Sequence, residues 1–268
     1  MSSERGEIKK IGFIGVGNMA AAIISGALAN GYGLENILGC DVYLEKIDAL
    51  GIEKRISAAQ LVADSDIIFL AVKPDNLDPL LEEIAGASAG KAFVSIVTGK
   101  KTQHIQKLLP GARVMRLVPN TPLLVGEGAM VISDETTFRN EEINYIEAFL
   151  GRLGTLCRLP EKLMDAATGL IGSGPAYVFV FIEALADASV KEGIPRDIAY
   201  RLAAQTVLGS GKMVLETGKP PALLKDAVTS PGGTTAAGLY AMEKGGFRAA
   251  AIDAVIEAIR RAHELSGS

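Results

Sequence analysis

The sequence predicts two domains of different class, an α/β domain over residues 1–160 and an all-helical domain over residues 161–268. In the first 160 residues, short apolar runs alternate with stretches of helical spacing, a pattern typical of a parallel sheet covered by helices. Beyond residue 160 the chain is rich in alanine, keeps the helical spacing and shows almost no strand pattern. We therefore expect a domain boundary near Pro160.

Apolar runs locate the strands of the first domain. The run 66–72 (DIIFLAV) is the clearest, because it is apolar throughout, as expected of a strand that helices cover on both faces. The other strands are expected at 8–15, 36–41, 92–97 and 113–118, with helices at 18–29 and 44–50.

Long helices are expected in the second domain, over residues 175–192, 196–216 and 248–265. Glycine and proline mark the breaks between them, at 193–195 and 218–221. These alanine-rich helices would bury little apolar surface on their own, so we expect a second copy of the chain to cover them.

The composition argues against several classes of function. The net charge is −4 and aromatic residues make up only 5% of the chain, which disfavours nucleic-acid binding. The chain has only two cysteines and two histidines, which are too few to favour a zinc site or a Cys/His nucleophile pair, so no metal is expected. There is no targeting pattern, and the apolar runs 20–29 and 177–182 are too short to cross a bilayer. We expect a cytoplasmic protein that binds no membrane.

A glycine-rich turn follows the first expected strand. Gly15, Gly17 and Ala20 match the pattern G-x-G-x-x-G/A, in which the first residue permits a tight turn, the second a close approach to a pyrophosphate and the third helix packing. The helix that begins near Asn18 would direct its unpaired N–H groups at the anion. Because a strand precedes the pattern and a helix follows it, we predict a Rossmann-type dinucleotide-binding domain.

Two charged residues could face the cofactor. Asp41 closes the second expected strand about 20 residues after the turn, where a carboxylate accepts a hydrogen bond from the ribose 2′-hydroxyl of NADH and repels the 2′-phosphate of NADPH. Asp41 could equally be a loop residue just beyond the strand, so the sequence leans only slightly to NADH. Lys73, at the carboxyl end of another strand, could face the cofactor or be a solvated loop residue.

A second unusual segment lies in the helical half, where residues 229–235 read TSPGGTT before a short helix at 236–244. Proline and paired glycines suit a concave set of N–H donors for a small carboxylate, but the segment also fits an ordinary turn between helices. The segment 172–176 (GSGPA) is a similar glycine-rich helix start. It is not a G-x-S-x-G nucleophile elbow, because Ile171 and Pro175 occupy the outer positions.

Together these segments resemble the pyrroline-5-carboxylate reductase family over nearly the whole chain. The resemblance is carried by IGFIGVGNMA (11–20), DIIFLAVKP (66–74), VPNTP (118–122), GLIGSGPAYVFVFIEALADA (169–188), LKDAVTSPGGTT (224–235) and GGFRAA (245–250). It implies hydride transfer from NADPH or NADH to the C=N carbon of 1-pyrroline-5-carboxylate, which gives L-proline in the last step of proline biosynthesis. It also implies a homodimer formed by interlocking helical domains, which in many relatives assembles into a decamer.

The resemblance also implies which residues form the site. In the turn 229–235, which it favours as a substrate loop, Thr235 would point its hydroxyl at the ring nitrogen and act as the catalytic residue. The implied substrate contacts are Glu161, Ser173, Ser230, Gly232, Gly233, Thr234 and Thr235. The implied cofactor contacts, to which the ribose argument adds Asp41, are Gly15, Val16, Gly17, Asn18, Met19, Ala71, Val72, Lys73, Pro74, Ile96, Val97 and Thr98.

Three positions depart from the family pattern. The segment 97–100 (VTGK) replaces a smaller Ala-Ala-Gly sequence, Val118 replaces a common Met, and Ala227 replaces an Asn that reaches the cofactor in some members. Two alternatives stay open from the sequence. One is a β-hydroxyacid dehydrogenase relative, for which Lys191 or Lys212 would have to be the catalytic lysine, and the other is a nucleotide-sensing protein without catalysis.

Overall fold

A computed structural model of the chain describes residues 10–267 and contains an eight-stranded sheet in the order β3-β2-β1-β4-β5-β6-β7-β8. Residues 8 and 9 of the first expected strand lie outside the described range. The strands are β1 (Ile11–Ile14), β2 (Ile37–Cys40), β3 (Glu53–Lys54), β4 (Ile67–Leu70), β5 (Ala92–Ser95), β6 (Arg113–Val118), β7 (Gly128–Ser133) and β8 (Gly154–Leu159).

From β3 to β6 the neighbouring strands are parallel, in the order of a Rossmann sheet. The alternation of the sequence predicted β1, β2, β4, β5 and β6 of this sheet. It did not predict β3, β7 or β8, of which β7 pairs antiparallel to β6, with Leu117 opposite Ile132. The short connection explains why β7 runs antiparallel to β6. Only a 3₁₀ turn (Thr121–Val125) lies between the two strands, and a parallel pair needs a long crossover connection.

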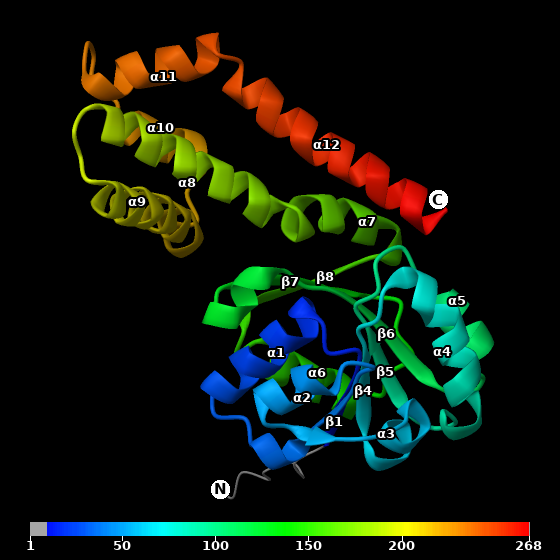
Figure 1. Cartoon of the computed structure of the whole chain (residues 1–268). Helices are drawn as coiled ribbons and strands as arrows, with labels where there is room; N and C mark the ends of the chain where they lie inside the picture. Colours follow the sequence, from blue (N-terminus) through cyan, green and yellow to red (C-terminus); the bar gives the residue numbers. More distant parts are fainter. Residues whose placement is uncertain (1–9, 268) are drawn as a thin grey trace, which may run out of the picture. The chain divides into compact units, whose positions relative to one another are not determined.

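Helices cover both faces of the sheet (Figure 1). On one face lie α1 (Asn18–Ala29), α2 (Leu44–Leu50) and α6 (Asn140–Leu150), and on the other lie α3 (Ala58–Asp64), α4 (Leu77–Ile84) and α5 (Thr102–Leu108). Phe13 and Phe69 stack on adjacent strands with their ring centroids 4.7 Å apart, and both are fully buried. The two apolar layers hold the sheet rigid, so the carboxyl ends of β1, β4 and β5 are fixed relative to one another.

The chain divides into two compact units, one formed by the sheet domain up to residue 173 together with the chain from 258 onward, and one formed by residues 174–257. In the first unit, α7 (Met164–Ala167) continues into a π-helical turn (Thr168–Gly172). The end of α12 (Phe247–Ser266) packs beside it. A Cβ on Gly169 would lie 2.4 Å from Ile259 Cγ1, so this approach requires a glycine.

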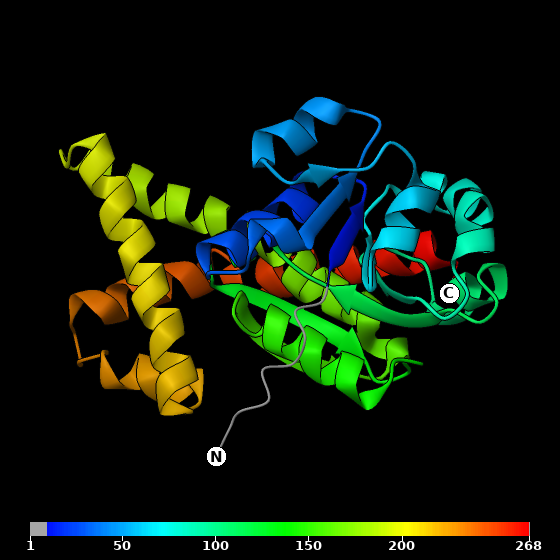
Figure 2. The same cartoon turned by 90° about the horizontal axis from the view of Figure 1, so that it is seen from below.

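The second unit is helical, as expected. It contains α8 (Gly174–Lys191), α9 (Arg196–Thr217), α10 (Pro221–Ala227), α11 (Thr234–Lys244) and the first part of α12 (Figure 2). Ala186, Ala199 and Ala203 form a small buried core between α8 and α9. Large apolar side chains stay exposed on these helices, among them Phe179, Val180, Leu215 and Tyr240.

Candidate active site

The glycine-rich turn between β1 and α1 has the geometry that a dinucleotide needs. Gly15 has a φ of +88°, and a Cβ there would lie 2.7 Å from the carbonyl oxygen of Ala71, so only glycine fits. A Cβ on Gly17 would meet nothing within 4 Å, which leaves open space where a pyrophosphate would approach. Ala20 is buried and packs α1 against the sheet. Each of the three small residues thus occupies the kind of position that its motif requires.

Asp41 lies directly beside this turn. Its Oδ2 accepts a hydrogen bond from the backbone N–H of Val16 at 2.6 Å, and its Oδ1 accepts one from the N–H of Tyr43 at 2.8 Å. Lys46 Nζ lies 3.8 Å from Oδ1, and the Asp41 side chain is 8% exposed. The carboxylate therefore orders the glycine-rich turn through a backbone contact.

The segment after β4 contributes backbone to the same edge of the sheet. Ala71 donates its N–H to the carbonyl of Ile14 at 2.9 Å, which holds the ends of β4 and β1 together. Val72 and Pro74 are half-buried. Lys73 is exposed and, among the described residues, takes part in no ion pair, so its side chain is solvated in this structure.

A cavity of about 340 Å³ opens near the carboxyl ends of β5 and β6. It brings together four of the expected cofactor residues with Ser173, one of the expected substrate residues. Its lining consists of Met19, Ile96, Val97, Thr98, Arg116, Leu117, Val118, Pro119, Thr168, Gly172 and Ser173. In open α/β sheets this edge is where ligands bind. The lining mixes apolar side chains with the polar groups of Thr98, Arg116, Thr168 and Ser173, which suits a planar ring that carries a polar substituent.

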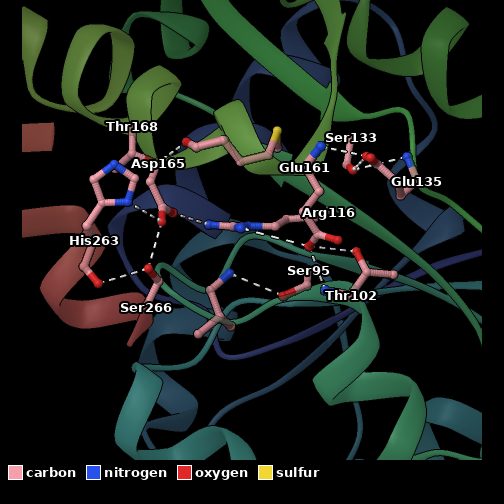
Figure 3. A network of polar contacts seen from close by, with 12 residues as sticks. Ser95, Thr102, Arg116, Ser133, Glu135, Glu161, Asp165, Thr168, His263 and Ser266 are labelled. Carbon is pink, nitrogen blue, oxygen red and sulfur yellow. Dashed lines mark hydrogen bonds and ion pairs between the residues drawn. The ribbon is translucent and has the colours of Figure 1, made fainter. Parts of the chain in front are cut away.

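The only guanidinium in this lining belongs to Arg116, the largest fully buried side chain among the described residues (Figure 3). Its Nη2 donates to Asp165 Oδ1 at 2.9 Å, and its Nη1 lies 3.8 Å from Glu161 Oε1. Asp165 in turn accepts a hydrogen bond from the Ser266 hydroxyl at 2.7 Å. A buried arginine needs such partners, because an unpaired buried charge is strongly unfavourable.

Burial alone would raise the pKa of Asp165. The hydrogen bonds from Ser266 and Arg116, together with the nearby charges of Arg116 and His263, outweigh burial and leave the pKa below its usual range. Nδ1 of His263 lies 3.4 Å from Asp165 Oδ2. Asp165 therefore stays ionised beside the cavity at neutral pH.

Glu161, which the resemblance placed near the substrate, is largely engaged within this network. Its Oε1 accepts hydrogen bonds from the backbone N–H of Thr102 at 2.7 Å and from the Thr102 hydroxyl at 3.0 Å. Its own N–H donates to Glu135 Oε2 at 2.5 Å. In this structure Glu161 joins the start of α5 to the Arg116 network.

The expected substrate turn belongs to the helical unit, whereas the expected cofactor residues belong to the sheet unit. Gly232 has a φ of +70°, and the N–H of Gly233 donates to the carbonyl of Ser230 at 3.0 Å. Helix α11 begins at Thr234 after Gly233, which has no side chain to cap it. Ser230 and Thr234 are exposed, and Thr235 is half-buried.

Comparison with known proteins identifies the family. Residues 161–265 match the family model for pyrroline-5-carboxylate reductase dimerisation, and residues 10–99 match the model for NADP oxidoreductase coenzyme F420-dependent. Pyrroline-5-carboxylate reductases of Methanosarcina acetivorans and Arabidopsis thaliana are 44% and 42% identical, with 97% of this chain and 98% and 96% of theirs covered. The chain belongs to the pyrroline-5-carboxylate reductase family.

A solved structure shows the same relationship. The Plasmodium falciparum pyrroline carboxylate reductase with NADP bound superimposes with a TM-score of 0.87 and 33% identity, covering 96% of this chain and 98% of that one. The pyrroline-5-carboxylate reductase family thus accounts for both halves of the chain. The expected fold class, a Rossmann-type domain followed by an all-α dimerisation domain, is confirmed.

Sequence reasoning missed Arg116, Asp165 and Ser266 of this network. A signal was present, because Arg116 interrupts the otherwise apolar middle of the expected strand 113–118. Asp165 and Ser266 carried no signal, since they are 101 residues apart in the chain and meet only in the folded structure.

Proposed function

We infer that the chain reduces 1-pyrroline-5-carboxylate to L-proline with NADPH or NADH. The observation that carries this inference is the cavity that joins Met19, beside the glycine-rich turn, to Thr98 and Ser173. The similarity to curated pyrroline-5-carboxylate reductases over 97% of the chain supports the same reaction. The NADP in the Plasmodium relative supports a nicotinamide cofactor and does not separate NADH from NADPH for this chain.

The cofactor would lie along the carboxyl edge of the sheet. The residues that would hold it are the thirteen expected from the sequence, with the N–H groups at the start of α1 and the open space at Gly17 facing the pyrophosphate. The cavity of about 340 Å³ would receive the nicotinamide ring. When bound, the reduced nicotinamide supplies the hydride.

The substrate would be held by the turn 229–235 of the helical domain. Its backbone N–H groups and hydroxyls would bind the carboxylate, since such donors stabilise a small anion without a bulky cation. The Thr235 hydroxyl would hydrogen-bond the ring nitrogen. A protonated cyclic imine already accepts hydride readily, so the residues chiefly have to align the imine carbon and exclude water, which can lower a barrier by roughly 7–11 kcal/mol.

We further propose that the helical domain, taken as residues 161–268, forms a homodimer. A groove of about 580 Å³ on α11 and α12 exposes Phe247, Ile252 and Ile256, and an apolar surface of this kind is typical of an interface between copies. The match to a dimerisation model supports this assignment. Assembly beyond the dimer, up to a decamer, and a cytoplasmic location remain expectations from the sequence.

One helical stretch, Glu161–Lys191, is long and apolar enough to span a membrane by length and composition alone. A helix of a soluble protein can pass the same test. We propose that its exposed Phe179 and Val180 are covered by the second copy of the chain. This assignment explains the apolar surface without a membrane.

Steady-state oxidation of NADH and NADPH, measured in parallel with racemic 1-pyrroline-5-carboxylate, tests the proposed reaction. The expected result is substrate-dependent oxidation of at least one cofactor with formation of proline. Proline formation is quantified directly, so that oxidation by a contaminant is not counted. Cofactor binding without any substrate-dependent oxidation would reject the reductase and favour a nucleotide-sensing protein.

A further inference from the structure

The last turn of α12 lies against the loop that follows β5. Gly99 has a φ of +75°, and a Cβ at this position would be 2.7 Å from the carbonyl oxygen of Leu265. It would also be 3.1 Å from the backbone nitrogen of Ser266. The two backbones therefore touch directly, and any side chain at position 99 would push the loop away from the helix.

The same turn of α12 reaches the cavity by a second route. The Ser266 hydroxyl donates to Asp165 Oδ2 at 2.7 Å, and Oδ1 of that carboxylate accepts from Arg116 at 2.9 Å (Figure 3). Asp165 is thereby held between the end of the chain and the arginine. Its side chain is only 7% exposed, so water replaces these partners poorly.

Both routes end in the lining of one cavity. Thr98, next to Gly99, lines the cavity of about 340 Å³, and so does Arg116. The end of α12 thus fixes two separate parts of this lining, one through backbone contact and one through Asp165. The second part of the lining, Arg116, is further joined to α5 through Glu161 and Thr102.

We propose that the last turn of α12, through Leu265 and Ser266, is a positioning element for the nicotinamide ring. It holds the Thr98–Gly99 backbone and the Arg116 guanidinium in the arrangement that accepts the ring. The inference rests on the proposed function in one respect, that this cavity receives the nicotinamide. Small displacements matter here, because a misplacement of about 1 Å between reacting groups can slow a reaction roughly 100-fold.

Two variants test the two routes separately. Ser266→Ala removes the hydrogen bond to Asp165, and Gly99→Ala forces the loop and Leu265 apart. Ser266→Thr keeps the hydroxyl and serves as the conservative rescue. Glu264→Gln is the matched control, since Glu264 lies on the same turn and bonds to Arg260 and Arg261 of its own helix.

The measurement is binding by titration calorimetry of NADH and of ADP-ribose, which shares every part of NADH except the nicotinamide. Ser266→Ala is expected to weaken NADH binding roughly two- to tenfold, the range for one lost hydrogen bond, and to leave ADP-ribose binding unchanged. Gly99→Ala is likewise expected to weaken NADH binding and to leave ADP-ribose binding unchanged. Ser266→Thr and Glu264→Gln are expected to bind both ligands as the unchanged chain does.

Equal weakening of NADH and ADP-ribose in both variants would overturn the proposal, because it would show a general loss of structure. Unchanged NADH binding in both variants would overturn it as well. The binding experiment needs no substrate. If the chain bound NADH but did not reduce 1-pyrroline-5-carboxylate, the proposed reaction would be rejected. The binding data for the variants would still show whether the end of α12 positions the nicotinamide ring.

Discussion

Val16 donates its backbone N–H to the carboxylate of Asp41 at 2.6 Å, which joins the glycine-rich turn to the end of β2. The sequence offered two interpretations of Asp41, a ribose acceptor and a loop residue. The hydrogen bond shows a third role, the ordering of the turn itself. Asp41 also keeps acceptor capacity on both oxygens, because each oxygen of a carboxylate can accept more than one hydrogen bond.

This contact predicts the effect of Asp41→Ala on cofactor binding. Because the turn loses a charge-assisted hydrogen bond, we expect weaker binding of both NADH and NADPH, by roughly tenfold or more for NADH. NADPH should lose less, since removal of the carboxylate also removes repulsion of the 2′-phosphate. Fluorescence titration of the two cofactors checks this. A gain in NADPH affinity without any loss for NADH would show that Asp41 does not order the turn.

Thr235→Ala is expected to lower kcat by roughly 100-fold, in the range of a lost proton-transfer or positioning group, and to leave NADH affinity near its original value. The reason is that Thr235 is proposed to contact the ring nitrogen and no part of the cofactor. Thr235→Ser keeps the hydroxyl and should recover most of the turnover. Unchanged turnover of the alanine variant in steady-state kinetics would remove Thr235 from the mechanism.

Arg116→Met is expected to lower the free energy of unfolding by about 3–5 kcal/mol, because it removes the buried guanidinium that pairs with the carboxylate of Asp165. Urea denaturation of the whole protein measures this. Lys54→Gln is the control, since the Lys54–Asp48 pair is exposed and such pairs contribute about 1 kcal/mol or less. Similar losses for both variants would mean that burial of Arg116 is unimportant for stability.

Asp165 also predicts a dependence of stability on pH. Its pKa is lowered in the folded chain, because its hydrogen bonds to Ser266 and Arg116 outweigh the effect of burial. The stability it contributes is therefore complete above its unfolded pKa of about 3.9 and is lost as the pH falls through the lower folded value. In urea denaturation Asp165→Asn should be less stable than the original chain near neutral pH, and the difference should narrow in acid. A difference that grows in acid would contradict the assignment.

Ile252→Asp is expected to produce monomers at micromolar concentration, since it places a charge in the exposed apolar groove of α12. Sedimentation velocity measures the oligomeric state. Lys244→Glu, on the neighbouring helix α11 and outside the groove lining, is the control for a change of charge alone. A dimer that persists in the aspartate variant would show that this groove is not the interface.

Local patterns in the sequence were sufficient for most of the fold and for the cofactor turn. The periodic apolar runs located β1, β2, β4, β5, β6 and the long helices, because burial on one or both faces imposes a spacing that can be read along the chain. The glycine positions identified the turn at Gly15 and Gly17, because backbone constraints act between near neighbours. The strands β3, β7 and β8 were missed, and with them the antiparallel pairing of β7, since the residues of a strand do not indicate which strand it joins.

Only the tertiary structure decided how Arg116, Asp165 and Ser266 come together and how Gly99 meets Leu265. These residues are separated by up to about 170 positions, and ion pairs and close backbone approaches depend on distance in space, which no local pattern encodes. The sequence by itself determined the kind of cofactor turn and the family resemblance. The folded chain decided which charges are buried beside the cavity. Once Arg116 and Asp165 are buried as a pair, removal of either charge leaves the other unpaired and strongly destabilises the protein.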